Sequence, residues 1–145
     1  MEEVRIEDWL LNIELEKMTA VYETHTNLCA CLSCQNFRKA HQDLDDEVMH
    51  FSNVLGIDLH KPSLLNAFEV EGNQIMYSGH YHVCGEILEG EIDEWDVVIG
   101  LHCFSLVEEV SSKPKMVTAP YFQIGFEVVL PWLLPENNGI NEEIR

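Results

Sequence analysis

Residues 37–55, FRKAHQDLDDEVMHFSNVL, decide the fold class of this 145-residue chain. Apolar side chains recur there at intervals of three and four residues, which is the spacing of an amphipathic helix. They are Phe37, Ala40 or His41, Leu44, Val48, Phe51 and Leu55. The acidic run at 45–47 is suited to the first turn of a second helix. The pattern therefore predicts two short helices, or one kinked helix, across about 34–55.

On both sides of this helical region the apolar period changes to two, which is typical of strands. Before it, Trp9, Leu11 and Ile13 alternate with polar residues within 8–16. After it, four further strands are expected at 64–70, 75–88, 95–107 and 121–130. The order predicts an α+β fold: one N-terminal strand, a helical pair, and a mainly antiparallel sheet with helices on one face.

The length of the chain is that of one domain, so we expect a single domain over 1–145 with a frayed polar tail at 136–145. No apolar run approaches the roughly 20 residues that a membrane-spanning helix needs. The acidic N-terminus lacks the basic and then apolar order of a signal peptide. A cytoplasmic location is therefore expected.

The charge of the chain is strongly negative, with 8 Lys and Arg against 26 Asp and Glu, a net charge of −18. Such a chain repels nucleic acid and anionic membrane surfaces, and it is attracted to basic proteins. Residues 62–112 contain acids but no Lys or Arg. This stretch is either a binding face for a basic partner or a solvated surface that keeps the protein soluble.

A cluster of possible metal ligands lies within residues 25–34: His25, Cys29, Cys31 and Cys34. Zinc takes four such ligands, and three cysteines with one histidine form a known structural type. The C-x-x-C spacing suits a metal, whereas the C-x-C spacing is tighter than usual. Two alternatives are unliganded thiols and a thiol oxidoreductase acting through Cys31 and Cys34. A helix start favours the thiolate form, but the βαβ context of thioredoxin-like enzymes is missing.

A second group of possible ligands lies on the expected strand at 75–88. The period of two places His80, His82 and Cys84 on one face. If the next strand forms a hairpin with it, His102 lies opposite His82 and completes a metal-like cluster. The alternative is a polar sheet face with histidines near solvent.

Three motifs carry a resemblance: Cys29-x-Cys31-x-x-Cys34-x-Asn36-Phe37, Tyr81-His82-x-x-Gly85-Glu86-Ile87, and Phe126-Glu127 followed by Pro131-Trp132. Together they resemble a set of small uncharacterised proteins from Gram-positive bacteria. The resemblance implies a bacterial cytoplasmic origin and lends no catalytic residues. Small acidic bacterial proteins of this size include neutralisers of toxins, an analogy of size and charge alone.

The sequence contains neither a glycine-rich phosphate loop nor a G-x-S-x-G motif. The leading hypothesis is a non-enzymatic acidic binding protein, an immunity-like or inhibitor-like partner of a basic protein, with or without a structural zinc ion. The alternatives are a zinc-binding domain built on residues 25–34 and the thiol oxidoreductase.

Overall fold

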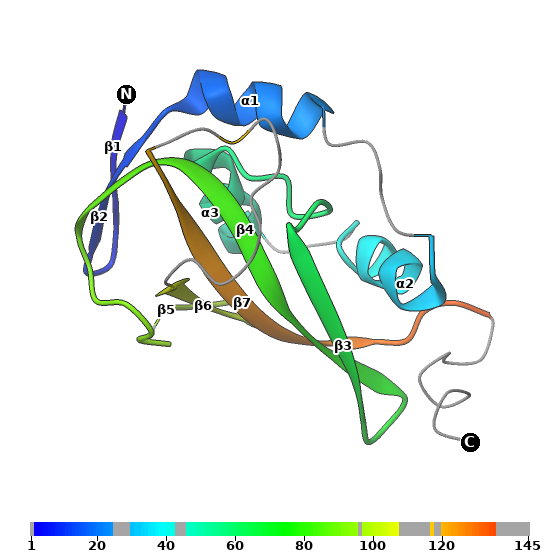
Figure 1. Cartoon of the computed structure of the whole chain (residues 1–145). Coiled ribbons are helices and arrows are strands. Elements are labelled where there is room, and N and C mark those ends of the chain that lie inside the picture. Colours follow the sequence, from blue (N-terminus) through cyan, green and yellow to red (C-terminus); the bar gives the residue numbers. More distant parts are fainter. Residues whose placement is uncertain are drawn as a thin grey trace.

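A computed structural model of the chain describes residues 2–24, 30–42, 46–95, 97–107, 117 and 120–135, and of Thr24 only the backbone. Within these residues the chain forms three helices and seven strands (Figure 1). In chain order they are β1 (Glu2–Ile6), β2 (Trp9–Ile13), α1 (Leu15–Thr24), α2 (Leu32–Ala40), α3 (Asp46–Leu55), β3 (Leu64–Val70), β4 (Gln74–Glu89), β5 (Val97–Ile99), β6 (His102–Val107) and β7 (Tyr121–Pro131).

The strands form one sheet in the order β1-β2-β4-β7-β6-β5, with β3 paired to β4 outside this path. β7 runs antiparallel along one side of β4, and β3 and then β2 share its other side. A Cβ at Gly79 would collide with the carbonyl oxygen of Leu64 on β3. A Cβ at Gly85, whose φ is +150°, would likewise collide with the carbonyl oxygen of Asn12 on β2. These two glycines therefore let one strand hold two partners along one side.

The helices cover one face of the sheet, which we call the inner face. The ring of Phe37, on α2, lies 5.1 Å from the ring of Tyr77 and 5.8 Å from that of Phe126. Phe51, on α3, stacks on Phe104 of β6 with ring centroids 4.1 Å apart. Because all five rings are buried, the main core lies between the sheet and these helices.

The opposite face, which we call the outer face, carries exposed apolar side chains. Phe68 on β3 pairs with Met76 on β4, and Met76 pairs with Val129 on β7. Paired residues of neighbouring strands point to the same face, so the three form one row across the sheet. The exposed fraction is 52% for Phe68 and 40% for Val129, so this row meets solvent.

The α+β class and the helical pair are confirmed, the pair being α2 and α3. The N-terminal strand is instead a β1–β2 hairpin that turns at Glu7, whose φ is +50°.

Helix α1 was not predicted, because Leu15 fits both the alternation of β2 and the helical spacing of Leu15, Met18 and Tyr22. The expected strand at 95–107 is divided by a turn at Gly100 into β5 and β6. The tail at 136–145 lies outside the described residues.

We predict that Phe37→Ala lowers the free energy of unfolding by about 3–5 kcal/mol, because it empties a space inside the aromatic core. The matched change Phe68→Ala removes an exposed ring and should cost less than about 1 kcal/mol. Urea denaturation of both variants measures the difference. Equal losses would contradict the assignment of inner and outer faces.

Candidate functional site

The first turn of α2 holds two of the four residues predicted to bind zinc. Cys31 is the N-cap residue, with an extended backbone at φ −65° and ψ 162°. Its Sγ accepts a hydrogen bond of 3.4 Å from the backbone N–H of Cys34. Both cysteines therefore lie at the start of the helix, with the Cys31 sulfur on the Cys34 backbone. His25 and Cys29, the other two predicted ligands, lie outside the described residues.

Metal and redox chemistry have little further geometric support in the described part of the chain. No group of three or more His, Cys, Asp or Glu side chains among the described residues is arranged to hold a metal ion. None of Cys31, Cys34, Cys84 and Cys103 forms a disulfide with another described cysteine. Helix α2 follows α1 in the chain, so the thiols do not sit in the βαβ setting of thioredoxin-like enzymes.

The Asn36-Phe37 part of the cysteine motif has a structural role. Asn36 is completely buried, and its Nδ2 group donates to the hydroxyl of Tyr77 at 3.2 Å and to the carbonyl of Pro131 at 3.1 Å. Its Oδ1 accepts from the backbone N–H of Leu133 at 2.7 Å. A buried amide needs such partners, since an unsatisfied polar group in a core is costly. Asn36 therefore ties α2 to the end of β7.

The cluster of His80, His82, Cys84 and His102 that a hairpin between their two strands would form is not present among the described residues. The expected register between His82 and His102 is wrong, because β7 lies between β4 and β6. His82 pairs with Gln123, and His102 pairs with Val128, the two being on opposite faces of β7. The chain order suggested a hairpin between β4 and β6. That hairpin does not form, because β4 and β6 each pair with β7 instead.

His82 is a buried link on the outer face and does not lie near solvent. The Gln123 amide group donates to His82 Nε2 at 3.0 Å. The ring proton then lies on Nδ1, which donates to the hydroxyl of Ser63 at 2.7 Å. Both ring nitrogens are engaged, so His82 joins β4 to β7 and to the residue before β3.

His102 meets a partner that the sequence reasoning missed, namely His41 at the C-cap of α2. The two Nε2 atoms lie 3.1 Å apart, and His41 Nδ1 lies 2.7 Å from the carbonyl oxygen of Phe37. Nδ1 therefore carries the proton of a neutral His41, and the Nε2–H of His102 donates to His41 Nε2. The helical spacing had marked Ala40 or His41 as a core position, but nothing local in the sequence indicated this contact, which spans 61 residues.

Burial lowers the pKa of His41 to about 4; the hydrogen bond to Phe37 opposes this effect and the nearby ring of His60 adds to it. His60 in turn donates from its backbone N–H and from Nδ1 to the carboxylate of Asp58, at 3.0 and 3.2 Å. The side-chain hydrogen bond from His60 holds the pKa of Asp58 below its usual value. The histidines of this region thus act as structural links.

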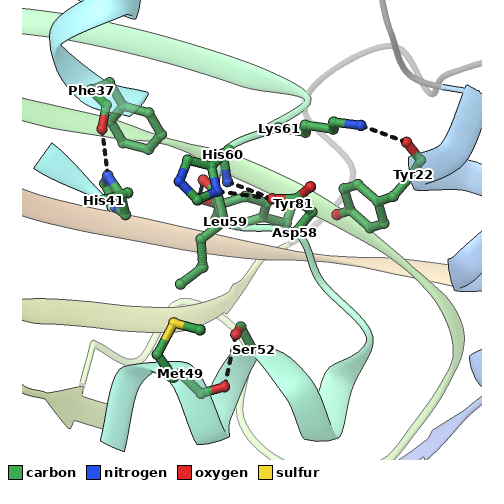
Figure 2. A network of polar contacts seen from close by, with 10 residues as sticks. All are labelled: Tyr22, Phe37, His41, Met49, Ser52, Asp58, Leu59, His60, Lys61 and Tyr81. Atoms are coloured by element: carbon green, nitrogen blue, oxygen red, sulfur yellow. Dashed lines mark hydrogen bonds and ion pairs between the residues drawn. The ribbon is translucent and has the colours of Figure 1, made fainter. Parts of the chain in front are cut away.

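The segment after α3 is held to the sheet and to α1 by two contacts to backbone carbonyls (Figure 2). The hydroxyl of Tyr81, on β4, donates to the carbonyl of Leu59 at 2.7 Å, and burial raises the pKa of Tyr81 well above its usual value. The Lys61 ammonium donates to the carbonyl of Tyr22 at 2.8 Å. Lys61, the last cation before the acidic stretch, is therefore turned toward α1.

Carboxylates dominate the described surface. Those with exposed side chains are Glu2, Glu3, Glu7, Asp8, Glu16, Glu23, Asp46, Glu47, Glu69, Glu71, Glu86, Glu89, Glu91, Asp93, Glu94 and Glu127. In the strand-rich half, the described residues between 62 and 107 include no Lys or Arg. Arg5 reaches Glu89 from β1, with 3.1 Å between the charged atoms. Such an exposed pair contributes little stability, so the outward carboxylates leave a negative surface.

We predict that acidification from about pH 6.5 to about pH 4 destabilises the protein through His41. Its pKa is lower in the folded chain than in the unfolded one, so the unfolded chain binds more protons across this window. Stability is therefore present above the unfolded pKa and is lost as the pH falls, by up to about 3 kcal/mol. Urea denaturation at constant ionic strength measures the slope.

The variant His41→Gln should have a shallower pH dependence, because its amide does not titrate. His50→Gln, which replaces an exposed histidine on α3, is the matched control and should keep the slope of the original protein. The same slope in His41→Gln would show that His41 does not titrate in this way.

No family model, curated protein or solved structure matches the chain. Within the described residues, no helix combines the length and apolar character needed to cross a membrane.

Proposed function

We propose that this protein is a non-enzymatic binding protein whose partner is a basic protein, in the manner of an immunity protein or an inhibitor. One observation carries the proposal: the strand-rich half presents exposed carboxylates without Lys or Arg among its described residues. Complementary charge raises the association rate and discriminates between partners. The same charge disfavours nucleic acid and anionic membranes as partners. A cytoplasmic location is part of the proposal.

The placement of these acids supports a binding role more than a solubility role alone. Glu86 pairs in register with Asn12, and Asn12 pairs with Glu3, so carboxylates from β4 and β1 share one row of the sheet. Glu127 lies on the outer face of β7, opposite Ser78. Rigid strands hold these charges at fixed spacings. A fixed array of charges can match a particular basic surface.

We predict that the purified protein, immobilised at low salt, retains a basic protein from a bacterial lysate and releases it as salt rises. The screening length falls from about 10 Å at 0.1 M to about 3 Å at 1 M, so charge-driven binding weakens across this range. A four-site change to glutamine at Glu69, Glu71, Glu86 and Glu91 should abolish the retention.

The matched control changes the same amount of charge in the helical half, at Glu16, Glu23, Asp46 and Glu47, with amide replacements. It should retain the partner, which mass spectrometry identifies. Retention that is insensitive to salt, or equal loss in the two four-site variants, would contradict a binding face in the strand-rich half.

A zinc-binding role is the second candidate, and the contact between Cys31 and Cys34 supports it. Two cysteines at a C-x-x-C spacing have the ligand spacing of one half of a structural zinc site. His25 and Cys29 would complete the set. Such an ion would organise the segment before α2 and is compatible with the binding role.

We predict that native mass spectrometry of protein purified without chelator shows one bound zinc ion. Cys31→Ser should release the ion, because a ligand is lost, whereas Cys103→Ser on β6 should not. A metal-free mass together with ready alkylation of Cys29, Cys31 and Cys34 would exclude the site.

A further inference from the structure

The strand β3 has an edge that no other described strand occupies. All seven of its residues pair with β4, from Leu64 opposite His80 to Val70 opposite Gln74. β2 lies further along the same side of β4 and does not pair with β3. Figure 1 shows β3 at the margin of the sheet. With respect to the described strands, its second edge therefore presents backbone N–H and C=O groups that an additional strand can pair with.

The other edge strands of the described sheet are less suited to such pairing. β1 carries three charged residues in five, namely Glu2, Glu3 and Arg5. β5 has only three residues. Charges and short length are devices by which proteins protect sheet edges. β3 has seven residues with a single charge, Glu69, and contains neither Lys nor Pro.

The outer face beside this edge supplies an apolar contact. Phe68 begins the row that continues through Met76 to Val129. Leu64, two rows away on the same face of β3, is 37% exposed. A strand added at the edge would place every second side chain on the outer face. An apolar side chain opposite Phe68 would therefore extend this row and cover the exposed ring.

The surrounding charge selects the occupant. Glu69 on β3, which points to the face opposite Phe68, and Glu71 in the turn after β3 are exposed. A second copy of this chain would bring the same carboxylates to the edge, and like charges in close contact repel. A segment whose apolar residues lie on the outer face turns its alternating basic residues to the opposite face, which is the face of Glu69.

We propose that the edge of β3 binds an extended segment of the basic partner as an added strand, with Phe68 as the apolar anchor. This proposal rests on the proposed function. Main-chain hydrogen bonds supply the pairing, the exposed row contacts the apolar residues, and the carboxylates attract the basic ones.

The probe is a synthetic seven-residue peptide that alternates lysine with valine, with binding measured by calorimetry at low salt. The original protein should bind it, and Phe68→Gln should weaken binding about fivefold to tenfold through the lost apolar contact. Leu88→Gln, which replaces another exposed apolar residue at 43% exposure on β4, is the matched control and should leave the affinity unchanged. Circular dichroism confirms that both variants fold.

Hydrogen exchange locates the peptide. Backbone amides of Leu64–Val70 should gain protection when the peptide binds, and those of β1 should not. A peptide of the same composition with N-methyl groups on alternate backbone nitrogens should fail to bind, because it cannot donate to the edge. Equal binding of a glutamate and valine peptide would overturn the choice of a basic occupant. Dimerisation of the protein alone that protects β3 would overturn it in favour of a second copy.

The lysate experiment separates the two proposals. If Phe68→Gln retains the salt-sensitive basic partner as well as the original protein does, or if the lysine and valine peptide protects no amide of β3, the strand-addition proposal fails and the binding function stands. If no salt-sensitive basic partner is retained, the proposed function itself fails.

Discussion

The pairing of β4 with β7 is the constraint on which the rest of the structure depends. It runs in unbroken register from Gln74 opposite Pro131 to Cys84 opposite Tyr121. This ladder sets which side chains face the helices, so Tyr77 and Phe126 meet Phe37 on one face while Met76 and Val129 point to the other. A slip by one residue would reverse every one of these placements. The core, the buried histidines and the exposed apolar row are therefore consequences of one register.

How far the sequence predicts this structure depends on the range of each interaction. The spacing of Phe37, Phe51 and Leu55 identified the helical pair, because helical contacts are local and repeat along the chain. Strand order is not local. Nothing near His82 or His102 indicates that β7 separates them, so the sequence left open a histidine cluster that the strand order rules out. The segment Leu15–Thr24 was missed for a related reason, since its helical spacing begins on a residue that also ends an alternating pattern. Cys31 and Cys34 lie at a helix start, as the sequence indicated, and the zinc site itself stays a prediction.

Buried polar contacts give part of the motif at residues 29–37 a role in folding. The Asn36 amide donates hydrogen bonds to the carbonyl of Pro131 at the end of β7 and to the hydroxyl of Tyr77. Phe37 packs beside it within the aromatic core. Because the bonds of a buried amide are directional, α2 can dock on the sheet in few other ways. His41 adds a second such bond at the other end of the same helix. The Asn-Phe pair therefore has a role in folding that does not depend on the cysteines before it.

The negative charge and the exposed edge of β3 are best understood together. An unprotected strand edge beside an exposed phenylalanine is ordinarily a site of self-association. A net charge of −18 counteracts this in every encounter between two copies, since each copy meets the carboxylates of the other. The same charge lowers the barrier to approach of a cationic segment. An acidic surface therefore lets a protein keep a sheet edge available while restricting which chains reach it, which is a form of specificity that requires no pocket.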